Sequence, residues 1–351
     1  MTVCFFGNYS PTYPRNVVLK LGLQKNGVQV LECNTRLTGW KKYWALYREH
    51  RKLKNDYDFL LVAFGGFTVV WLAKVLTRKK IVFDAFVSLY LTNVEDRKVC
   101  RPQSLQARIY AFWDKFSCRL ADRVLLDTKA QIDYFVQSYG LPEKKFFRLF
   151  VGADDGIFAK GKPLRPSKEF IVHWHGHIVP FHGLKTILRA AEELQDKDEE
   201  IKFRIVTRFN SRYQKVKEEV ERKNLKNVFF YPEASFAKLA EYLRDADVVL
   251  GIFGSNKKAQ FVIPNKIFEG IASGKAVITA STSAVLELFT DGQNIVLVEP
   301  ENPSRLAQAI LDLKKDPSLL HPIAERAYWL YQNRLTPKLL GQELVQILQG
   351  L

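Results

Sequence analysis

Short apolar runs alternate with amphipathic segments along most of the chain. In the first half we expect six buried strands, at Val3–Gly7, Val28–Cys33, Phe59–Phe64, Ile81–Phe86, Val124–Asp127 and Phe147–Val151. In the second half we expect six more, at Phe170–Trp174, Phe203–Thr207, Val228–Tyr231, Val248–Phe253, Ala276–Thr279 and Ile295–Val298. Continuous apolar runs of this length are typical of parallel strands that helices cover on both faces.

Segments with a helical period lie between these strands. The clearest are Asn16–Lys25, Gln103–Leu120, Leu184–Leu194, Tyr213–Arg222, Phe236–Arg244, Lys266–Ala272, Pro303–Leu313, Ile323–Asn333 and Pro337–Leu348. The alternation predicts two doubly wound α/β domains that bind ligands beyond the carboxyl ends of their strands, in a cleft between them. We expect domains over 1–160 and 161–325, helices over 326–351, and a Pro/Gly/Lys-rich linker at Ala159–Lys168.

Charge divides the chain into two unequal halves. Its 351 residues include 53 Lys and Arg and 37 Asp and Glu, a formal net charge of +16. Residues 1–150 hold 25 of the basic and 12 of the acidic residues, so the remainder is nearly neutral. An excess confined to one half indicates a polyanionic surface partner, either nucleic acid or an anionic membrane.

Aromatic and basic residues concentrate between Trp40 and Lys54. At helical spacing the aromatic side chains share one face and the cations lie mostly elsewhere, which suits a membrane interface. The candidate membrane-facing residues are Trp40, Lys41, Lys42, Trp44 and Arg48. The alternative is a helix that packs its aromatic stripe on the sheet and leaves its lysines in water.

Cysteine usage and the first residues indicate a reducing compartment. The four cysteines are far apart and form no CxxC pair, so we expect no disulfide framework. The opening MTVCFFGNYS lacks the basic and apolar regions of a signal peptide. The longest apolar stretch, Phe59–Ala73, is too short to span a bilayer. We therefore expect a cytoplasmic protein.

The segment Gly251–Thr279 joins a strand end, a polar loop and a helix that Pro264 opens. Free N–H groups and the dipole at a helix start favour a phosphate, and Lys266 adds a full charge there. Glu269 lies on the same helix and can accept two hydrogen bonds from vicinal ribose hydroxyls. The alternative is an ordinary strand–helix unit in which Lys266 and Glu269 form a surface ion pair.

Four of the six histidines, His173, His175, His177 and His182, lie within ten residues. Imidazole is a common metal ligand, but the segment holds no Asp, Glu or Cys to complete a zinc set, and we expect no metal. We expect Gly176 to end the strand, so that His177 and His182 flank an anion at the next helix start. Histidines that cap backbone groups are the alternative.

Two features of the first half point to its own ligand contacts. Gly7 ends the first strand, where its backbone can approach a phosphate, and Arg15 follows as a phosphate contact or a solvated charge. Asp84 lies at the carboxyl end of a strand, the position of a catalytic or acceptor-binding group in an open sheet. A turn or helix-capping role is the alternative for Asp84.

One group of motifs carries a family resemblance. The runs Ile263-Pro264-Asn265-Lys266, Phe268-Glu269, Ser273-Gly274-Lys275 and Ala276-Val277-Ile278 closely resemble the donor-binding signature of glycosyltransferase family 4, and Ser283, Glu287, Gly292 and Asn294 continue it. Gly176 and Gly183 match its glycine–basic–x(4)–basic–glycine loop, and Asp122–Thr128 and Leu149–Phe158 look like its domain-crossing region. The resemblance covers nearly the whole chain and is strongest over 251–300.

The resemblance implies a GT-B fold, with two Rossmann-like domains facing a cleft and a last helix that crosses back to the N-terminal domain. It implies that a nucleotide-diphosphate sugar binds mainly the C-terminal domain, with the ribose on Glu269 and no cofactor. The donor-binding candidates are Gly7, Gly176, His182, Gly183, Lys258, Pro264, Asn265 and Glu269. The acceptor binds the N-terminal domain in that family, and the anomeric configuration is retained.

The sequence departs from the family pattern at three places. His177 and His182 replace the Arg and Lys that are usual in the glycine loop. Phe261 stands where many members have a second Glu, and Asp84 stands where a His is often found. The charge of the diphosphate must then be met partly by Lys266 and by Lys257 or Lys258.

The resemblance implies a retaining glycosyltransferase, and we expect Asp84, Lys266 and His177 as its catalytic residues. We expect a lipid-linked or cell-envelope glycan as acceptor, at the inner face of the cell membrane. A sugar-nucleotide epimerase of the same fold is the alternative enzyme. A basic nucleic-acid-binding protein is the non-enzymatic alternative, but no known nucleic-acid motif is present.

Overall fold

The computed structural model describes residues 1–53, 56–162 and 168–351, and the chain divides into two compact units. Unit 1 comprises Met1–Gly152 and Leu335–Leu351, and unit 2 comprises Ala153–Arg334. The unit limits therefore lie at 152 and 334, where the sequence pattern placed them at 160 and 325. Part of the expected linker, residues 163–167, lies outside the described residues, as does Lys54 of the aromatic and basic segment.

Unit 1 is built on a six-stranded parallel sheet in the order β2-β1-β3-β4-β5-β6. Its strands are β1 (Thr2–Gly7), β2 (Gln29–Asn34), β3 (Phe59–Val62), β4 (Lys80–Phe86), β5 (Arg123–Leu126) and β6 (Phe146–Arg148). The four central strands are buried almost throughout, because helices cover both faces of the sheet.

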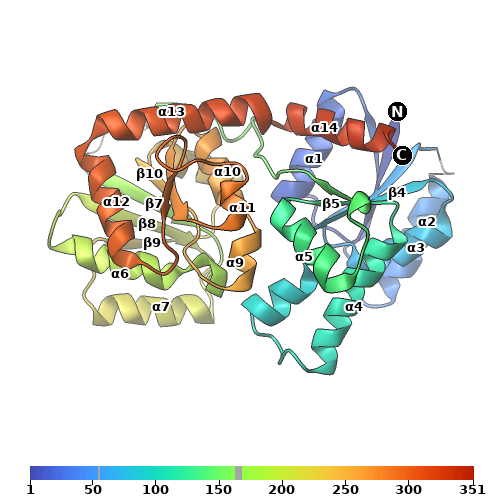
Figure 1. Ribbon diagram of the computed structural model, residues 1–351, viewed down its shortest axis with the longest axis horizontal. Coiled ribbons are helices and arrows are strands. Elements are labelled where there is room, and N and C mark those ends of the chain that lie inside the picture. The colour runs from blue at the N-terminus through green and yellow to red at the C-terminus, as the bar shows by residue number, and fades with distance from the viewer. Residues whose placement is uncertain (54–55, 163–167) are drawn as a thin grey trace. The chain divides into compact units, whose positions relative to one another are not determined.

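The helices of unit 1 lie on two sides of that sheet (Figure 1). They are α1 (Pro14–Lys25), α2 (Lys41–Lys52), α3 (Val70–Leu76), α4 (Leu105–Leu120), α5 (Lys129–Tyr139) and α14 (Pro337–Gln349), with short turns η1 (Phe67–Val69), η2 (Leu91–Asp96) and η3 (Glu143–Lys145). Helix α14 packs along α1, so the end of the chain returns to unit 1 as expected.

Unit 2 contains a second six-stranded parallel sheet, in the order β12-β11-β10-β7-β8-β9. Its strands are β7 (Phe170–His175), β8 (Ile201–Thr207), β9 (Val228–Pro232), β10 (Val248–Leu250), β11 (Ala276–Ala280) and β12 (Val296–Val298). All twelve strands correspond to expected apolar runs. Strand β10 is shorter than expected, because the residues after Leu250 turn toward the segment that follows β7.

Helices also flank the unit 2 sheet. They are α6 (Leu184–Gln195), α7 (Ser211–Arg222), α8 (Phe236–Arg244), α9 (Lys257–Phe261), α10 (Asn265–Ala272), α11 (Ser283–Leu286), α12 (Pro303–Lys315) and α13 (Pro317–Arg334), with the turn η4 (Pro180–His182). Helix α6 packs on α12, and α10 packs on α13. Two doubly wound α/β units are thereby confirmed. Within the described residues, no helix has both the length and the apolarity that crossing a bilayer requires.

Candidate active site

The unit 2 sheet reverses its strand order between β7 and β10. Ligands of open parallel sheets bind beyond the carboxyl ends of the strands at such a reversal. The two segments that leave β7 and β10 meet there, because the backbone N–H of Phe253 donates to the carbonyl of His182 at 3.1 Å and that of Gly254 to the carbonyl of Phe181 at 3.2 Å. Three predicted donor-side residues, His182, Lys266 and Glu269, are brought together at this reversal.

Glycines make this close contact of the two segments possible. Gly183 has a φ of +67°, and a Cβ atom there would lie 2.4 Å from the carbonyl carbon of Phe253. A Cβ atom on Gly254 would lie 2.7 Å from the carbonyl oxygen of Phe181. A Cβ atom on Gly176 would lie 3.2 Å from Nζ of Lys266, so the absence of a side chain keeps space beside that ammonium group. The predicted glycine loop therefore borders Lys266 directly.

Lys266, in the first turn of α10, is the central cation of the site. Its side chain is buried with 4% exposure, and its Nζ lies 4.2 Å from the ring centroid of Trp174. The described residues offer Nζ no hydrogen-bond acceptor. Burial therefore lowers the pKa of Lys266 well below its ordinary value, and nearby Glu269 only partly opposes this. A buried cation without an acceptor is costly, and an anionic ligand would supply the acceptor.

Glu269 lies one helical turn after Lys266 and is also buried. Its Oε2 is 2.7 Å from Nε2 of His175, and Nδ1 of His175 is 3.1 Å from Nε2 of His173. Burial, with the nearby charge on His175, lowers the pKa of His173 well below its ordinary value. Within the described parts of the chain, no three metal-ligating side chains gather as they would around a metal ion. The two histidines instead form a hydrogen-bonded chain that orients the carboxylate of Glu269.

Two partners of the site were missed by sequence reasoning. Trp174 provides the ring under Lys266, and His175 holds Glu269. Trp174 lies between two of the four clustered histidines and was given no role, and His175 was weighed only as a metal ligand. The alternation of His173 and His175 on one strand face was the available signal. The contact of His175 with Glu269 joins residues 94 positions apart and was not readable from either motif.

The two histidines of the glycine loop have different surroundings. His182 is buried beside Trp174, and its Nδ1 lies 2.5 Å from the carbonyl oxygen of His177. Burial and the charge of Lys266 lower the pKa of His182 well below its ordinary value. The side chain of His177 is 58% exposed and points to Glu233 at 4.0 Å. His182 therefore lies in the Lys266 cluster, whereas the imidazole of His177 lies outside it.

The remaining donor candidates of unit 2 lie around the same strand ends. Lys258 is buried, with Nζ 4.5 Å from the ring centroid of Phe181 in the glycine loop. Pro264 is the N-cap residue of α10 and Asn265 is its first residue, and no side chain caps this helix start. The first turn of α10 therefore presents its N–H groups next to Lys266.

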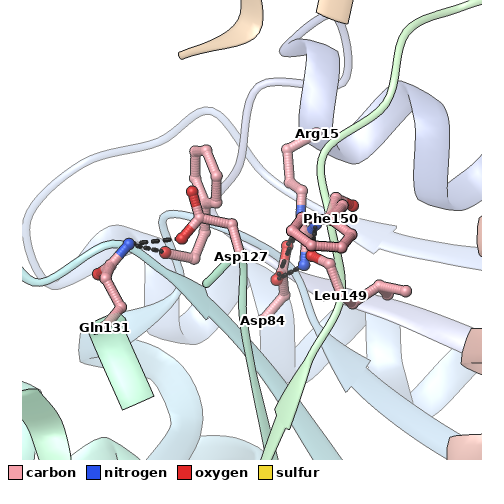
Figure 2. A network of polar contacts seen from close by, with 7 residues as sticks. Arg15, Asp84, Asp127, Gln131, Leu149 and Phe150 are labelled. Atoms are coloured by element: carbon pink, nitrogen blue, oxygen red, sulfur yellow. Dashed lines mark hydrogen bonds and ion pairs between the residues drawn. The ribbon is translucent and has the colours of Figure 1, made fainter. Parts of the chain in front are cut away.

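Asp84, a predicted catalytic residue, lies in a buried ion pair of unit 1. Both carboxylate oxygens bind the guanidinium of Arg15, at 2.9 to 3.2 Å, and neither side chain is exposed (Figure 2). Arg15 also donates to the carbonyls of Leu149 and Phe150, at 2.6 and 2.8 Å. Burial raises the pKa of Asp84, and Arg15 opposes that rise. The pair joins α1, β4 and the segment after β6, so Arg15 is neither a phosphate contact nor a solvated charge.

Gly7 and the aromatic and basic segment also belong to unit 1. Gly7 ends β1 with a φ of +146°, a conformation that favours glycine.

On α2 and just before it, Trp44 and Trp40 are exposed by 58% and 73%. Lys41 and Arg48 are also exposed, whereas Lys42 donates to Thr68 at 2.7 Å. The aromatic stripe is thus divided, because Tyr43 packs against Trp71 while the two tryptophans face solvent.

A groove of about 650 Å³ lies beside the candidate site, between α6 and α7. Gly183, Lys185, Arg189 and Arg212 contribute to its walls. Neither Lys266 nor Glu269 lines it. The chemistry of the site is therefore defined by the strand ends, and the groove shares only the glycine loop with it.

Residues 169–316 match the family model described as glycosyl transferases group 1. A D-inositol 3-phosphate glycosyltransferase of Streptomyces bingchenggensis is 24% identical over 224 residues, covering 59% of this chain and 48% of that protein. An uncharacterised glycosyltransferase of Methanocaldococcus jannaschii is 25% identical over 150 residues, covering 43% of this chain and 40% of that protein. The chain therefore spans about half the length, or less, of these curated relatives.

Solved structures share the fold over the entire chain. The Anabaena protein HepE, solved in complex with UDP-glucose, has a TM-score of 0.75 at 16% identity, with complete coverage of both chains. Sucrose-phosphate synthase from Thermosynechococcus elongatus has a TM-score of 0.80 at 13% identity, covering 100% of this chain and 98% of that one. Residues 169–316 of unit 2 thus match the group 1 glycosyl transferase model, and the chain shares the GT-B fold of these solved structures.

Proposed function

We propose that the protein is a retaining glycosyltransferase that takes a sugar from a nucleotide-diphosphate sugar bound at the carboxyl edge of the unit 2 sheet. The observation that carries the proposal is Lys266, a buried ammonium group at the strand-order reversal to which the described residues offer no hydrogen-bond acceptor. A diphosphate is the anion that fits this position, since an uncapped helix start and His182 lie beside it. That HepE was solved with UDP-glucose supports the same class of donor.

Each residue of the site has a defined part in this proposal. Glu269, oriented by His175, accepts the ribose hydroxyls. Lys266 and His182 donate to the diphosphate, and the first turn of α10 adds its N–H groups. The glycine loop brings its backbone close because Gly176 and Gly183 carry no side chain.

The chemistry follows from these positions. The bond between the anomeric carbon and the diphosphate oxygen breaks, and a bond to an acceptor hydroxyl oxygen forms as that hydroxyl loses its proton. Negative charge develops on the departing diphosphate. Lys266 and the α10 helix start are already fixed around it, and such preorganised charge lowers the barrier for departure. Positioning of donor and acceptor supplies the rest, and the proposal needs no nucleophile from the protein.

We further propose that the acceptor is a glycan or lipid-linked glycan at the inner face of the cell membrane. The support is the net positive charge of residues 1–150 and the exposed Trp40 and Trp44 beside Lys41 and Arg48. Indole rings flanked by cations are typical of a membrane-water interface. Replacing both tryptophans by Gln should weaken recovery on anionic vesicles, and equal recovery of the native protein on neutral and anionic vesicles would contradict this placement.

A turnover screen tests the proposed reaction. Nucleotide-diphosphate sugars are incubated with the protein, and released nucleoside diphosphate is measured. We expect one donor to be consumed by the native protein and not by Glu269→Ala. Glu241→Ala is the control, because Glu241 is a partly exposed glutamate of the same unit that pairs with Lys238 on α8, and this variant should consume the donor as the native protein does. Conversion of a donor to its epimer without acceptor would favour the epimerase, and no release from any donor would contradict transfer.

A further inference from the structure

Helix α4 in unit 1 exposes large apolar side chains on the face that points away from the sheet. Its inner face is anchored by Ala107, Asp114, Ser117 and Cys118, all of which are fully buried. Its outer face nonetheless presents Leu105, Ile109 and Phe112, with 75%, 45% and 52% of their surface exposed. An amphipathic helix ordinarily turns such residues inward. The exposed apolar stripe therefore calls for an explanation outside the fold.

The stripe is continuous along the helix. Leu105, Ile109, Phe112 and Phe116 follow one another at intervals of four, three and four residues, which places them on one helical face. The rings of Phe112 and Phe116 stack with centroids 5.0 Å apart, and Trp113 packs edge-on against Phe112 at 5.4 Å. The aromatic end of the stripe is thus a preformed surface.

Six cations lie on α4 and in the segment before it. Arg97, Lys98, Arg101, Arg108, Lys115 and Arg119 are all exposed. The only acidic residue between Arg97 and Arg119 is Asp114, which is buried and accepts hydrogen bonds from Ser88 and Tyr139 and from two backbone N–H groups. None of the six cations forms an ion pair with a residue that the structure describes. Three of them, on α4 itself, lie along one flank of the stripe at helical spacing.

We propose that the outer face of α4 docks on an anionic lipid surface, with the stripe among the acyl chains and the cations at the headgroups. Apolar residues on one face and unpaired cations at its border are the signature of a helix lying in the interface plane. Anionic lipids supply the counter-charges that the protein does not. A symmetric contact with a second copy would instead bring the same cations together without acidic partners.

The outer face of α4 is a different surface from the one formed by Trp40 and Trp44 at α2. Helix α3 lies between α2 and α4 and contacts both, so the two surfaces follow one another along one side of unit 1 (Figure 1). The proposal for α4 does not depend on donor binding or transfer, because the residues that carry it are all in unit 1, whereas the candidate site lies in unit 2.

Vesicle sedimentation of the full chain tests the proposal. Phosphatidylcholine vesicles with and without phosphatidylglycerol are compared for the native protein, for Ile109→Gln with Phe112→Gln, and for Arg108→Gln with Arg119→Gln. We expect native binding to require phosphatidylglycerol. The apolar pair of changes should weaken it about tenfold or more, and each lost cation about fivefold.

Trp329→Gln is the matched control, because Trp329 is an exposed aromatic residue of α13 in unit 2, and it should bind as the native protein does. Unchanged thermal melting of each variant shows that the changes act on docking. Native-like vesicle binding by the apolar variant would overturn the proposal. The proposal would also be overturned if the native protein bound no vesicles and formed a dimer that the apolar variant lost. Salt-sensitive binding of duplex DNA, without vesicle binding, would overturn it as well.

Discussion

At the residue scale, the candidate site differs from the scaffold in whether its buried cation has a hydrogen-bond acceptor among the described residues. Lys266 and His182 share a small volume beside Trp174, and burial lowers the pKa of both side chains. Arg15 and Asp84 show the opposite arrangement, because the buried guanidinium donates three hydrogen bonds to the buried carboxylate. One buried cation is therefore poised for a ligand, and the other is part of the scaffold.

The lowered pKa values predict that nucleotide binding takes up protons. A bound diphosphate favours the charged forms of Lys266 and His182, so it raises their pKa values from the depressed values of the free protein. Affinity for UDP should then fall as pH rises through the pKa values of the free protein. Calorimetry in buffers of different ionisation enthalpy, at a pH where UDP is fully ionised, should show proton uptake, and His182→Gln should show less. Proton release in both proteins would contradict this account of the site.

The buried ion pair predicts that Asp84 matters for stability. Asp84→Asn leaves the Arg15 guanidinium buried without its counter-charge, which should cost about 3–5 kcal/mol of unfolding free energy. Asp133→Asn is the control, because Asp133 pairs with Lys129 at the surface and its loss should cost at most about 1 kcal/mol. Chemical denaturation measures both. Equal midpoints for the two variants, with activity lost only in Asp84→Asn, would restore Asp84 as a catalytic candidate.

At the element scale, the periodicity of the chain predicted the strands and most helices. It did not predict which elements contact one another. Continuous apolar runs identified all twelve strands, because parallel strands are buried on both faces. Helix α3 was not predicted, since it lies within a single apolar stretch with β3. The exposure of the apolar stripe on α4 could not be predicted either, because the sequence pattern is the same whether the stripe faces the sheet or solvent.

The junction of α1 and α14 is the sharpest contact of this kind. Gly22 and Gly341 face one another, and a Cβ atom on Gly341 would lie 2.1 Å from the carbonyl oxygen of Gly22. Asn26 adds a hydrogen bond to the carbonyl of Lys338 at 2.8 Å. The two helices therefore pack with their backbones in contact, and the end of the chain is held on unit 1 at this point.

Gly341→Ala should lift α14 from α1 at a cost of about 1–3 kcal/mol, because the added methyl group meets backbone that cannot yield. Faster hydrogen exchange in α14 and α1 would report the displacement. Gln342→Ala is the control, since Gln342 is exposed on the same helix and should leave exchange unchanged. Unaltered exchange in Gly341→Ala would show that the contact is not needed for docking.

At the scale of the whole molecule, sequence reasoning anticipated the α/β class and the division into two doubly wound units. Lys266, Glu269, His182 and the two loop glycines meet at one strand-order reversal, which parallel topology alone predicts. The exposure of the His177 imidazole and the burial of Asp84 could not be predicted from the sequence, because burial depends on contacts from distant segments. The charge asymmetry of the chain remains consistent with unit 1 facing a polyanionic surface, and α4 now adds a second cluster to it.

The central claim is that Lys266 is kept buried for an anionic diphosphate, and the variant Lys266→Met tests it most directly. Removing a buried cation without an acceptor should raise the free energy of unfolding by about 1–4 kcal/mol. We expect UDP to stabilise the native protein against heat, and the same change should abolish that stabilisation. Without UDP, Lys266→Met should therefore melt at a higher temperature than the native protein. Addition of UDP should leave the melting temperature of the variant unchanged. A lower melting temperature combined with a native UDP shift would contradict the account.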